Sequence, residues 1–277
     1  MISSVLIIGG GVMGEGMARQ LVMHNTVAAQ SMLIVDHNEA KAAALSESIN
    51  IPVATTLPKG ELHRFAVIIL AVKPQDAVSV LKQLKAEPLG NQLVISIMAG
   101  LSLASLSKSL AYHRVVHAMP NLPITIGQGV IAWCADAGCS ETDRQLVQQL
   151  FLGMGSVIEI AEEHLNAVTA ISGSGPGYFY AFADHFMQAA AALGIDKVIT
   201  QELVKATLLG ASALYGESDL SPAELKSKVT SKNGTTEAAL TVIEQRKVAE
   251  AWQEALKIAK QRAGEMAQSL DISDELA

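Results

Sequence analysis

The first half of the chain alternates short runs of β-branched and other apolar residues with longer stretches in which apolar residues recur every three or four positions. The short runs predict buried strands, and the longer stretches predict amphipathic helices. The predicted strands are residues 5–8, 32–35, 66–72, 93–97, 115–117, 130–134 and 157–160. The predicted helices between them are residues 13–24, 39–48, 75–85, 103–110 and 141–151, the last with Ser140 as N-cap and Asp143 at N3. This alternation predicts an α/β fold with a parallel sheet covered by helices.

Strand signals cease near residue 162, and the rest of the chain reads as Ala- and Leu-rich helices. These helices are expected at residues 178–193, 197–215, 235–245 and 248–270, interrupted by Gly194, by residues 216–222 and by residues 231–234. We therefore predict two domains, a sheet domain over residues 1–161 and an all-helical domain over residues 162–277. The helical half is too short to enclose a large core alone, so its apolar faces predict burial against a second copy, in a homodimer at least.

Composition narrows the possible partners. The chain has 277 residues, of which 50% are hydrophobic and 17% charged, and this balance excludes a disordered regulator. A formal net charge of −7 argues against nucleic acid or an acidic membrane as a partner. Cys134 and Cys139 are too few for a disulfide scaffold and lack the companions of a zinc site, so we expect buried thiols and no metal. The N-terminal apolar run is too short for a signal peptide or a membrane span, and we expect a cytoplasmic protein.

A glycine-rich turn joins the first predicted strand to the first predicted helix. Its residues are Gly9-Gly10-Gly11-Val12-Met13-Gly14. The order of strand, glycine turn and helix is the one that a dinucleotide pyrophosphate needs: Gly9 permits the tight turn, Gly11 leaves room for the anion, and Gly14 lets helix and strand approach. This context predicts a Rossmann-type cofactor site that includes Gly9, Gly11, Val12, Met13 and Gly14.

The second predicted strand is followed by Asp36, at the spacing where a carboxylate can bind the hydroxyls of the adenosine ribose. A 2′-phosphate beside Asp36 would be repelled, and His37 and Lys41 are the nearby groups that could compensate. The cofactor is therefore NADH or NADPH, with a slight preference for NADH. A carboxylate at a strand end can also be an ordinary helix N-cap, and this alternative stays open.

Three further loops fall at the carboxyl ends of predicted strands, the edge where open α/β sheets bind ligands. They are Ala71-Val72-Lys73-Pro74, Ala99-Gly100 and the segment Met119-Pro120-Asn121-Leu122-Pro123. We expect the first two to bracket the nicotinamide and Asn121 to present its amide to cofactor or substrate. Each loop can also be an ordinary turn whose residues are there for the backbone conformation alone. Lys73 is better suited to a structural or positioning role than to acid catalysis, and His117 is expected to be a core residue.

Taken together, the motifs resemble the pyrroline-5-carboxylate reductase family, which reduces a cyclic imine acid to proline. The resemblance rests on the glycine turn, Ala71-Val72-Lys73-Pro74, Ala118-Met119-Pro120-Asn121, Ser172-Gly173-Ser174-Gly175-Pro176-Gly177-Tyr178 and Gly234-Thr235-Thr236, in the family's order. It implies an N-terminal dinucleotide-binding domain, a C-terminal substrate-binding and dimerisation domain, and NADH or NADPH as hydride donor.

The resemblance also implies roles for residues of the helical half. The Thr236 hydroxyl would hydrogen-bond the imine nitrogen, while Ser231 and the amides of Gly234, Thr235 and Thr236 would receive the substrate carboxylate. This agrees with their place before a predicted helix, where free N–H groups favour an anion, although Ser231 and the threonines could simply cap that helix. Ser174 and Ser172 are either helix caps or part of the substrate pocket.

The chain departs from the family pattern at several positions. Lys232-Asn233 stands where the family usually has Pro-Gly, which puts a cation beside the expected carboxylate site. The other departures are Val12 for Asn, Leu122 for Thr and Gly177 for Ala. The identity of the proton donor and the exact substrate therefore stay open. Alternatives are a related imine or β-hydroxyacid reductase and a catalytically idle nicotinamide-binding sensor.

Overall fold

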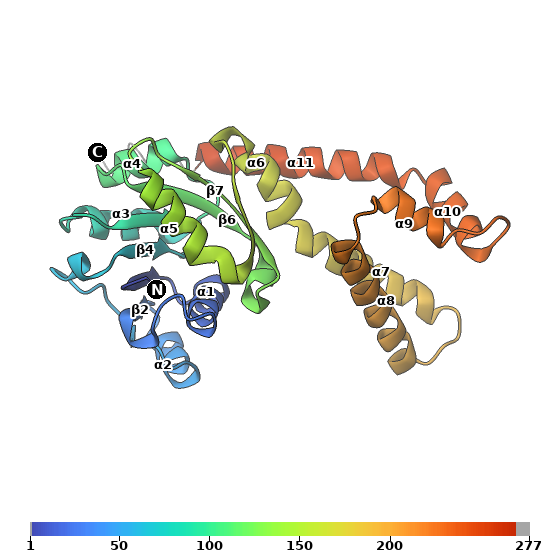
Figure 1. Cartoon of the computed structure of the whole chain (residues 1–277), viewed down its shortest axis with the longest axis horizontal. Coiled ribbons are helices and arrows are strands. Elements are labelled where there is room, and N and C mark those ends of the chain that lie inside the picture. Colours follow the sequence, from blue (N-terminus) through green and yellow to red (C-terminus); the bar gives the residue numbers. More distant parts are fainter. Residues whose placement is uncertain (1, 270–277) are drawn as a thin grey trace. The chain divides into compact units, whose positions relative to one another are not determined.

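The computed structural model describes residues 2–269. Within this range, eight strands form one sheet in the order β3-β2-β1-β4-β5-β6-β7-β8 (Figure 1). The strands are β1 (Val5–Ile8), β2 (Met32–Val35), β3 (Val53–Ala54), β4 (Val67–Leu70), β5 (Leu93–Ser96), β6 (Val115–Pro120), β7 (Gly129–Ala135) and β8 (Gly155–Glu159). Strands β1 to β6 are parallel, β7 is antiparallel to β6, and β8 is parallel to β7. The predicted α/β fold class is confirmed.

The helices of the described part of the chain follow the predicted order closely. They are α1 (Val12–Met23), α2 (Glu39–Ser48), α3 (Ala77–Lys85), α4 (Leu103–Leu110), α5 (Glu141–Phe151), α6 (Leu165–Val168), α7 (Gly175–Ala191), α8 (Lys197–Glu217), α9 (Pro222–Lys228), α10 (Thr235–Gln245) and α11 (Val248–Ser269). A π-helix, Thr169–Gly173, follows α6. The predicted cap of α5 is confirmed as a capping box between Ser140 and Asp143.

The central strands are buried on both faces, as a parallel sheet covered by helices requires. Alternate residues of β1 enter two separate cores: Val5 and Ile7 pack with side chains of α1, α2 and α5, whereas Leu6 and Ile8 pack with side chains of α3, α4 and α6. In the sequence, strands that are buried on both faces appear as uninterrupted apolar runs. The helices cover the two faces of the sheet, so the connecting loops lie at the carboxyl ends of the strands.

The described residues fall into two compact units, residues 2–174 with 259–269 and residues 175–258. The expected boundary between residues 161 and 162, and the roles assigned to the two halves, stay predictions. The last residues of the predicted helix 248–270 and of the predicted domain 162–277, from residue 270 onward, lie outside the described residues.

Several element boundaries differ from the prediction. The predicted strand 66–72 is shorter, because the chain leaves the sheet at Ala71. Met119 and Pro120 belong to β6 and not to the loop after it. Pro120 pairs with Ile131 of β7, but the N–H of the next residue, Asn121, is the one that points to β7, where it donates to the carbonyl of Val130. The nitrogen of Pro120 therefore faces the side of β5, which has already ended at Ser96, so no hydrogen bond is lost there.

Three of these strands and α-helices were absent from the prediction: β3, α6 and α9. Strand β3 has two residues, which is too short for a recognisable apolar pattern. Helix α9 begins at the last residue of the predicted break 216–222 and covers residues that the prediction left unassigned. It has Pro222 at N1 and a capping box between Ser221 and Glu224.

Candidate cofactor and substrate sites

The glycine turn brings three backbone segments into close contact. Gly9 has φ +110°, and a Cβ on it would lie 2.5 Å from the carbonyl oxygen of Ala71. A Cβ on Gly14 would lie 2.0 Å from the carbonyl oxygen of Gly9. Both positions therefore admit glycine alone, and together they allow β1, β4 and α1 to meet.

Space is open in front of the N-terminus of α1. A Cβ on Gly11 would have one atom within 4 Å, the Nζ of Lys41 at 3.8 Å. Gly11 is also the N-cap of α1 and supplies no side-chain cap. The first turn of α1, with Val12 67% exposed and Met13 packed partly against the core, thus presents free N–H groups and the positive end of the helix dipole. An anion such as a pyrophosphate suits this place.

Asp36, at the end of β2, accepts hydrogen bonds with both carboxylate oxygens. Oδ2 accepts from the backbone N–H of Gly10 at 3.0 Å and from Nζ of Lys41 at 2.6 Å, and Oδ1 accepts from the N–H of Asn38 at 3.1 Å. Burial by itself would raise the pKa of Asp36, but Lys41 and the amides of Asn38 and Gly10 outweigh it and the pKa is lowered. The carboxylate is therefore ionised and largely occupied. It does not cap α2, whose N-cap side chain is Asn38.

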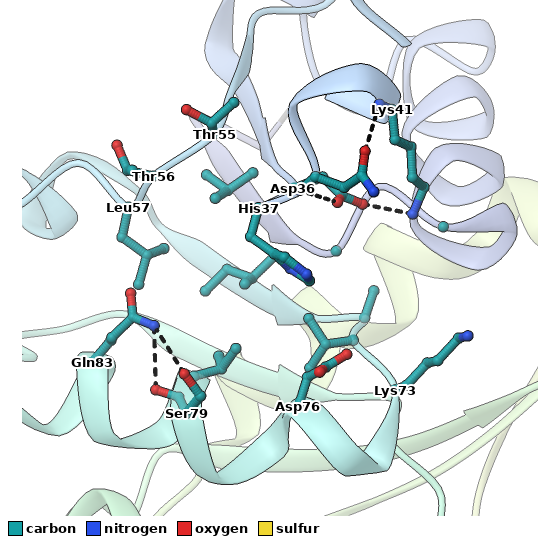
Figure 2. A pocket seen from close by; sticks show the side chains of 18 residues that line it. Asp36, His37, Lys41, Thr55, Thr56, Leu57, Lys73, Asp76, Ser79 and Gln83 are labelled. Atoms are coloured by element: carbon teal, nitrogen blue, oxygen red, sulfur yellow. Dashed lines mark hydrogen bonds and ion pairs between the residues drawn. The ribbon is translucent and has the colours of Figure 1, made fainter. Parts of the chain in front are cut away.

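A cleft of about 590 Å³ lies at the carboxyl ends of β1, β2 and β4. Figure 2 shows Asp36 and Lys41 on one side of the cleft and Lys73, Asp76 and Ser79 on the other. Of the predicted cofactor residues, the cleft is lined by Gly9, Gly11, Asp36, Ala71, Val72 and Lys73. Its size and its place where the strand order reverses are those of a dinucleotide site.

The cleft also contains polar residues that the sequence prediction missed: Asn38, Thr55, Thr56, Asp76, Ser79 and Gln83. Thr55 and Thr56 follow the two-residue strand β3, which gave no signal. Ser79 and Gln83 are four residues apart on α3, and the Gln83 amide donates to the Ser79 carbonyl at 3.3 Å. Their helical spacing could have placed them on one face, but only the fold shows that this face borders the cleft.

The other predicted cofactor residues of the sheet unit do not line this cleft. Pro74 begins a 3-10 helix, Pro74–Asp76. Gly100, with φ +82°, follows β5 and lines a second, smaller cavity of about 100 Å³. Asn121 follows β6, and its amide is bonded within the protein: Oδ1 accepts from the N–H of Val130 at 2.8 Å, and Nδ2 donates to Ser172.

Ser174 ends the π-helix, and its N–H donates to the carbonyl of Thr169 at 2.8 Å. Ser172, the partner of Asn121, lies within this π-helix. Such single π-turns are frequent at functional sites. Ser174 itself directly precedes α7.

The predicted substrate residues form a tight turn before α10, within the unit 175–258. The N–H of Gly234 donates to the carbonyl of Ser231 at 3.0 Å, and Asn233, at φ +58°, donates its N–H to Oε2 of Glu237 at 2.6 Å. Gly234 is the N-cap, and no side chain caps α10. Ser231 and the threonines therefore do not serve as side-chain caps here. The turn leaves Ser231, Lys232, Asn233 and Thr235 exposed and Thr236 half-buried.

Both cysteines are buried free thiols. Burial raises the pKa of Cys134 to about 12 and that of Cys139 to about 11. Among residues 2–269, no three His, Cys, Asp or Glu side chains are grouped as a metal site would require. In the same range, no helix combines the length and the apolar character needed to cross a membrane.

The sheet order, the glycine turn and the cleft define a Rossmann-type dinucleotide-binding protein. Comparison with known proteins gives the family. The family model for pyrroline-5-carboxylate reductase dimerisation matches residues 162–266, and the model for NADP oxidoreductase, coenzyme F420-dependent, matches residues 4–100.

Relatives match over nearly the whole chain. A pyrroline-5-carboxylate reductase of Synechocystis sp. is 34% identical over 94% of this chain and 97% of its own length. The solved structure of such a reductase from Coxiella burnetii is 29% identical, with a TM-score of 0.87 over 96% of this chain and 99% of that one. The Plasmodium falciparum enzyme, solved with NADP bound, is 26% identical, with a TM-score of 0.84 over 95% and 98%. The chain belongs to the pyrroline-5-carboxylate reductase family.

Proposed function

We propose that this protein reduces 1-pyrroline-5-carboxylate to L-proline with NADH or NADPH, the last step of proline biosynthesis. The observation that carries the proposal is the match to pyrroline-5-carboxylate reductases over more than nine-tenths of the chain. The dinucleotide cleft in the sheet unit agrees with it.

In this proposal the dinucleotide lies in the cleft with its pyrophosphate at the N-terminus of α1. Gly9, Gly11 and Gly14 allow the approach, and the amides of Val12 and Met13 face the anion. Ala71 to Pro74, with Ala99 and Gly100, border the nicotinamide end. Asn121 supports this end indirectly, by holding Ser172.

Cofactor preference rests on Asp36 and Lys41. A preference for NADH requires a carboxylate that is free to bind the ribose hydroxyls. Asp36 already accepts three hydrogen bonds, one of them from its ion-pair partner Lys41. The half-exposed Lys41 also lines the cleft. We propose that Lys41 offsets the repulsion by Asp36 and lets the site accept NADPH as well as NADH. The Plasmodium relative, solved with NADP bound, supports this proposal.

Lys41→Ala tests the cofactor assignment. Loss of a charge-assisted contact to the 2′-phosphate is expected to lower kcat/KM for NADPH about tenfold more than for NADH. Lys82→Ala, which removes an exposed lysine of α3 that does not line the cleft, is the matched control. An equal loss with both cofactors would reject the role of Lys41.

The substrate carboxylate is proposed to bind the turn before α10. The N-cap of this helix is Gly234 and no side chain caps it, so its first N–H groups are free for an anion. Ser231 adds a hydroxyl, and Lys232 and Asn233 border the same turn. Ser174 is assigned to the wall of the substrate pocket.

The chemistry needs a hydride at the imine carbon and a proton at the nitrogen. A bound reduced nicotinamide would supply the hydride. Reduction is easier when the nitrogen is already protonated, because the electron pair that the C=N bond releases is then neutralised. Thr236 is the residue proposed to hydrogen-bond this nitrogen and to keep its proton in place.

A homodimer is the smallest assembly we propose. Large apolar side chains of α7 are exposed in the single chain: Phe179 is 73% exposed, and Phe182 and Phe186 are each 46% exposed. Residues 162–266 match a family model for dimerisation. Light scattering after gel filtration should therefore give at least twice the chain mass of 29.2 kDa.

Steady-state turnover tests the proposed reaction. Purified protein is mixed with 1-pyrroline-5-carboxylate and NADH or NADPH, and both cofactor oxidation and proline formation are followed. Reduction of six-membered cyclic imines, or oxidation of β-hydroxyacids when NAD⁺ or NADP⁺ is supplied, in place of pyrroline-5-carboxylate reduction would favour a related reductase. Cofactor binding without any turnover would favour the sensor.

A further inference from the structure

His117 and Ser96 are two buried polar side chains on neighbouring strands: Ser96 ends β5, and His117 lies within β6. They are register partners of β6 and β5, and their exposed fractions are 3% and 0%. Both contact the backbone of Met98. Nε2 of His117 lies 3.1 Å from the Met98 carbonyl oxygen, and the Met98 N–H donates to Oγ of Ser96 at 3.2 Å. One peptide segment is therefore held from two sides.

These contacts fall where the chain leaves the sheet. Ile97 still bonds to β4, through its N–H and the carbonyl of Leu70 at 3.0 Å, but Met98 has moved past the last ladder pair at Ser96. Met98 is 1% exposed, so water cannot readily serve its backbone groups. A buried N–H or C=O without a partner is strongly disfavoured. Ser96 and His117 supply the two missing partners.

The contact with Met98 fixes the state of the imidazole. A carbonyl oxygen only accepts, so Nε2 of His117 carries the hydrogen and Nδ1 has a bare lone pair. Nδ1 is buried and has no hydrogen-bond partner among the described residues. Burial lowers the pKa of His117 to about 4, so the ring is neutral near pH 7. The hydrogen bond from Nε2 to the Met98 carbonyl offsets the cost of leaving Nδ1 buried without a partner.

The segment held in this way continues into Ala99 and Gly100, the residues assigned above to the nicotinamide end. Gly100 has φ +82° and, together with His117, lines the cavity of about 100 Å³. The far end of the loop is also anchored, because the N–H of Leu103 donates to Oε1 of Glu162 at 2.6 Å. The loop between Met98 and Leu103 thus has fixed ends.

We propose that His117 is a positioning residue: its Nε2–H holds the Met98 carbonyl and, together with Ser96, sets the backbone of Ala99 and Gly100 against the nicotinamide. This inference rests on the proposed function, since it needs a nicotinamide at that loop. It gives a role to a histidine that the sequence alone marked as a core residue.

Two substitutions at His117 separate positioning from packing. In His117→Gln the amide nitrogen can occupy the place of Nε2 and still donate to Met98. In His117→Asn the amide reaches the place of Nδ1, so the bond is lost with a side chain of similar polarity. Val116→Ala is a control for general destabilisation, because Val116 is buried in the core on the opposite face of the sheet.

The readouts are the Kd of the preferred reduced cofactor, the Kd of ADP-ribose, which lacks the nicotinamide, and the KM and kcat of turnover. His117→Asn is expected to weaken binding of the reduced cofactor about tenfold, which corresponds to 1.4 kcal/mol, and to leave ADP-ribose within about twofold. His117→Gln and Val116→Ala should match the wild type in both. Ser96→Ala should shift binding in the same direction as His117→Asn.

Equal behaviour of the Gln and Asn variants would overturn the proposal. A loss of ADP-ribose binding as large as that of the whole cofactor, or a loss in Val116→Ala as large as in His117→Asn, would do the same. Failure of the proposed function looks different, because the wild type would then bind the reduced cofactor without reducing the imine, and the binding measurements would still decide the role of His117.

Discussion

The neutral, buried His117 makes the stability of the fold depend on pH. Its pKa falls from 6.5 in an exposed histidine to about 4 in the folded protein, because burial disfavours the imidazolium. Between these two pH values the unfolded chain takes up a proton at His117 that the folded chain does not. The contribution of His117 to the free energy of unfolding is therefore fully present above pH 6.5 and is lost as the pH falls toward 4. The full difference corresponds to about 3 kcal/mol.

Replacement of His117 by Gln isolates this contribution. Gln does not titrate and can keep the hydrogen bond to the Met98 carbonyl. From pH 7 to pH 5 the wild type should therefore lose about 2 kcal/mol of unfolding free energy relative to His117→Gln. Cys134 on β7 and Glu162 in the adjacent cavity are titratable groups near the ring, and both are present in both proteins, so the comparison cancels their own titration.

Urea unfolding at pH 7.0, 6.0 and 5.0, followed by far-UV circular dichroism at one protein concentration, measures the difference. The two stability curves should diverge steadily below pH 6.5, with the variant less sensitive to acid. If the wild type and His117→Gln change in parallel over this range, the imidazole is not held neutral by burial and the reasoning is refuted.

Three further predictions concern other parts of the structure. Gly14→Ala should abolish NAD(P)H binding as measured by fluorescence titration and lower the Tm, because the new Cβ would lie 2.0 Å from a backbone oxygen; normal binding would contradict the close packing. Cys134 and Cys139 should not react with a disulfide reagent at pH 8 in the native protein, because fewer than about one thiol in a thousand is ionised, whereas both should react in denaturant; rapid native labelling would show that a thiol is accessible. Thr236→Ala should lower kcat about a hundredfold without changing cofactor binding, and Thr236→Ser should restore most of it; undiminished turnover in Thr236→Ala would remove Thr236 from the mechanism.

Much of the fold could be predicted because its signals are local. Apolar runs such as residues 5–8 and 93–97 are long enough to show a strand that is buried on both faces. The glycine motif is equally local, since it occupies residues 9–14, although the contact with Ala71 that makes Gly9 necessary joins distant segments. Caps such as Ser140 depend on residues three positions apart.

The features that the sequence did not predict depend on contacts between segments that are far apart in the chain. The sequence named Lys41 only as a possible compensating charge, whereas the fold pairs it with Asp36 at 2.6 Å and changes what that carboxylate can bind. The hydrogen bond from His117 to Met98 joins β6 to the segment that follows β5, and no spacing in the sequence indicates it. Strand β3 is an element of two residues that exists only by pairing with β2.

The proposed activity of this chain is the reduction of a cyclic imine acid with a nicotinamide dinucleotide. The most direct measurement is the stoichiometry of one reaction, in which purified protein, 1-pyrroline-5-carboxylate and NADPH or NADH are combined and both products are quantified. One L-proline should form for each reduced cofactor consumed, with saturation in both substrates. Absence of proline with either cofactor, from protein that binds NAD(P)H, would contradict it.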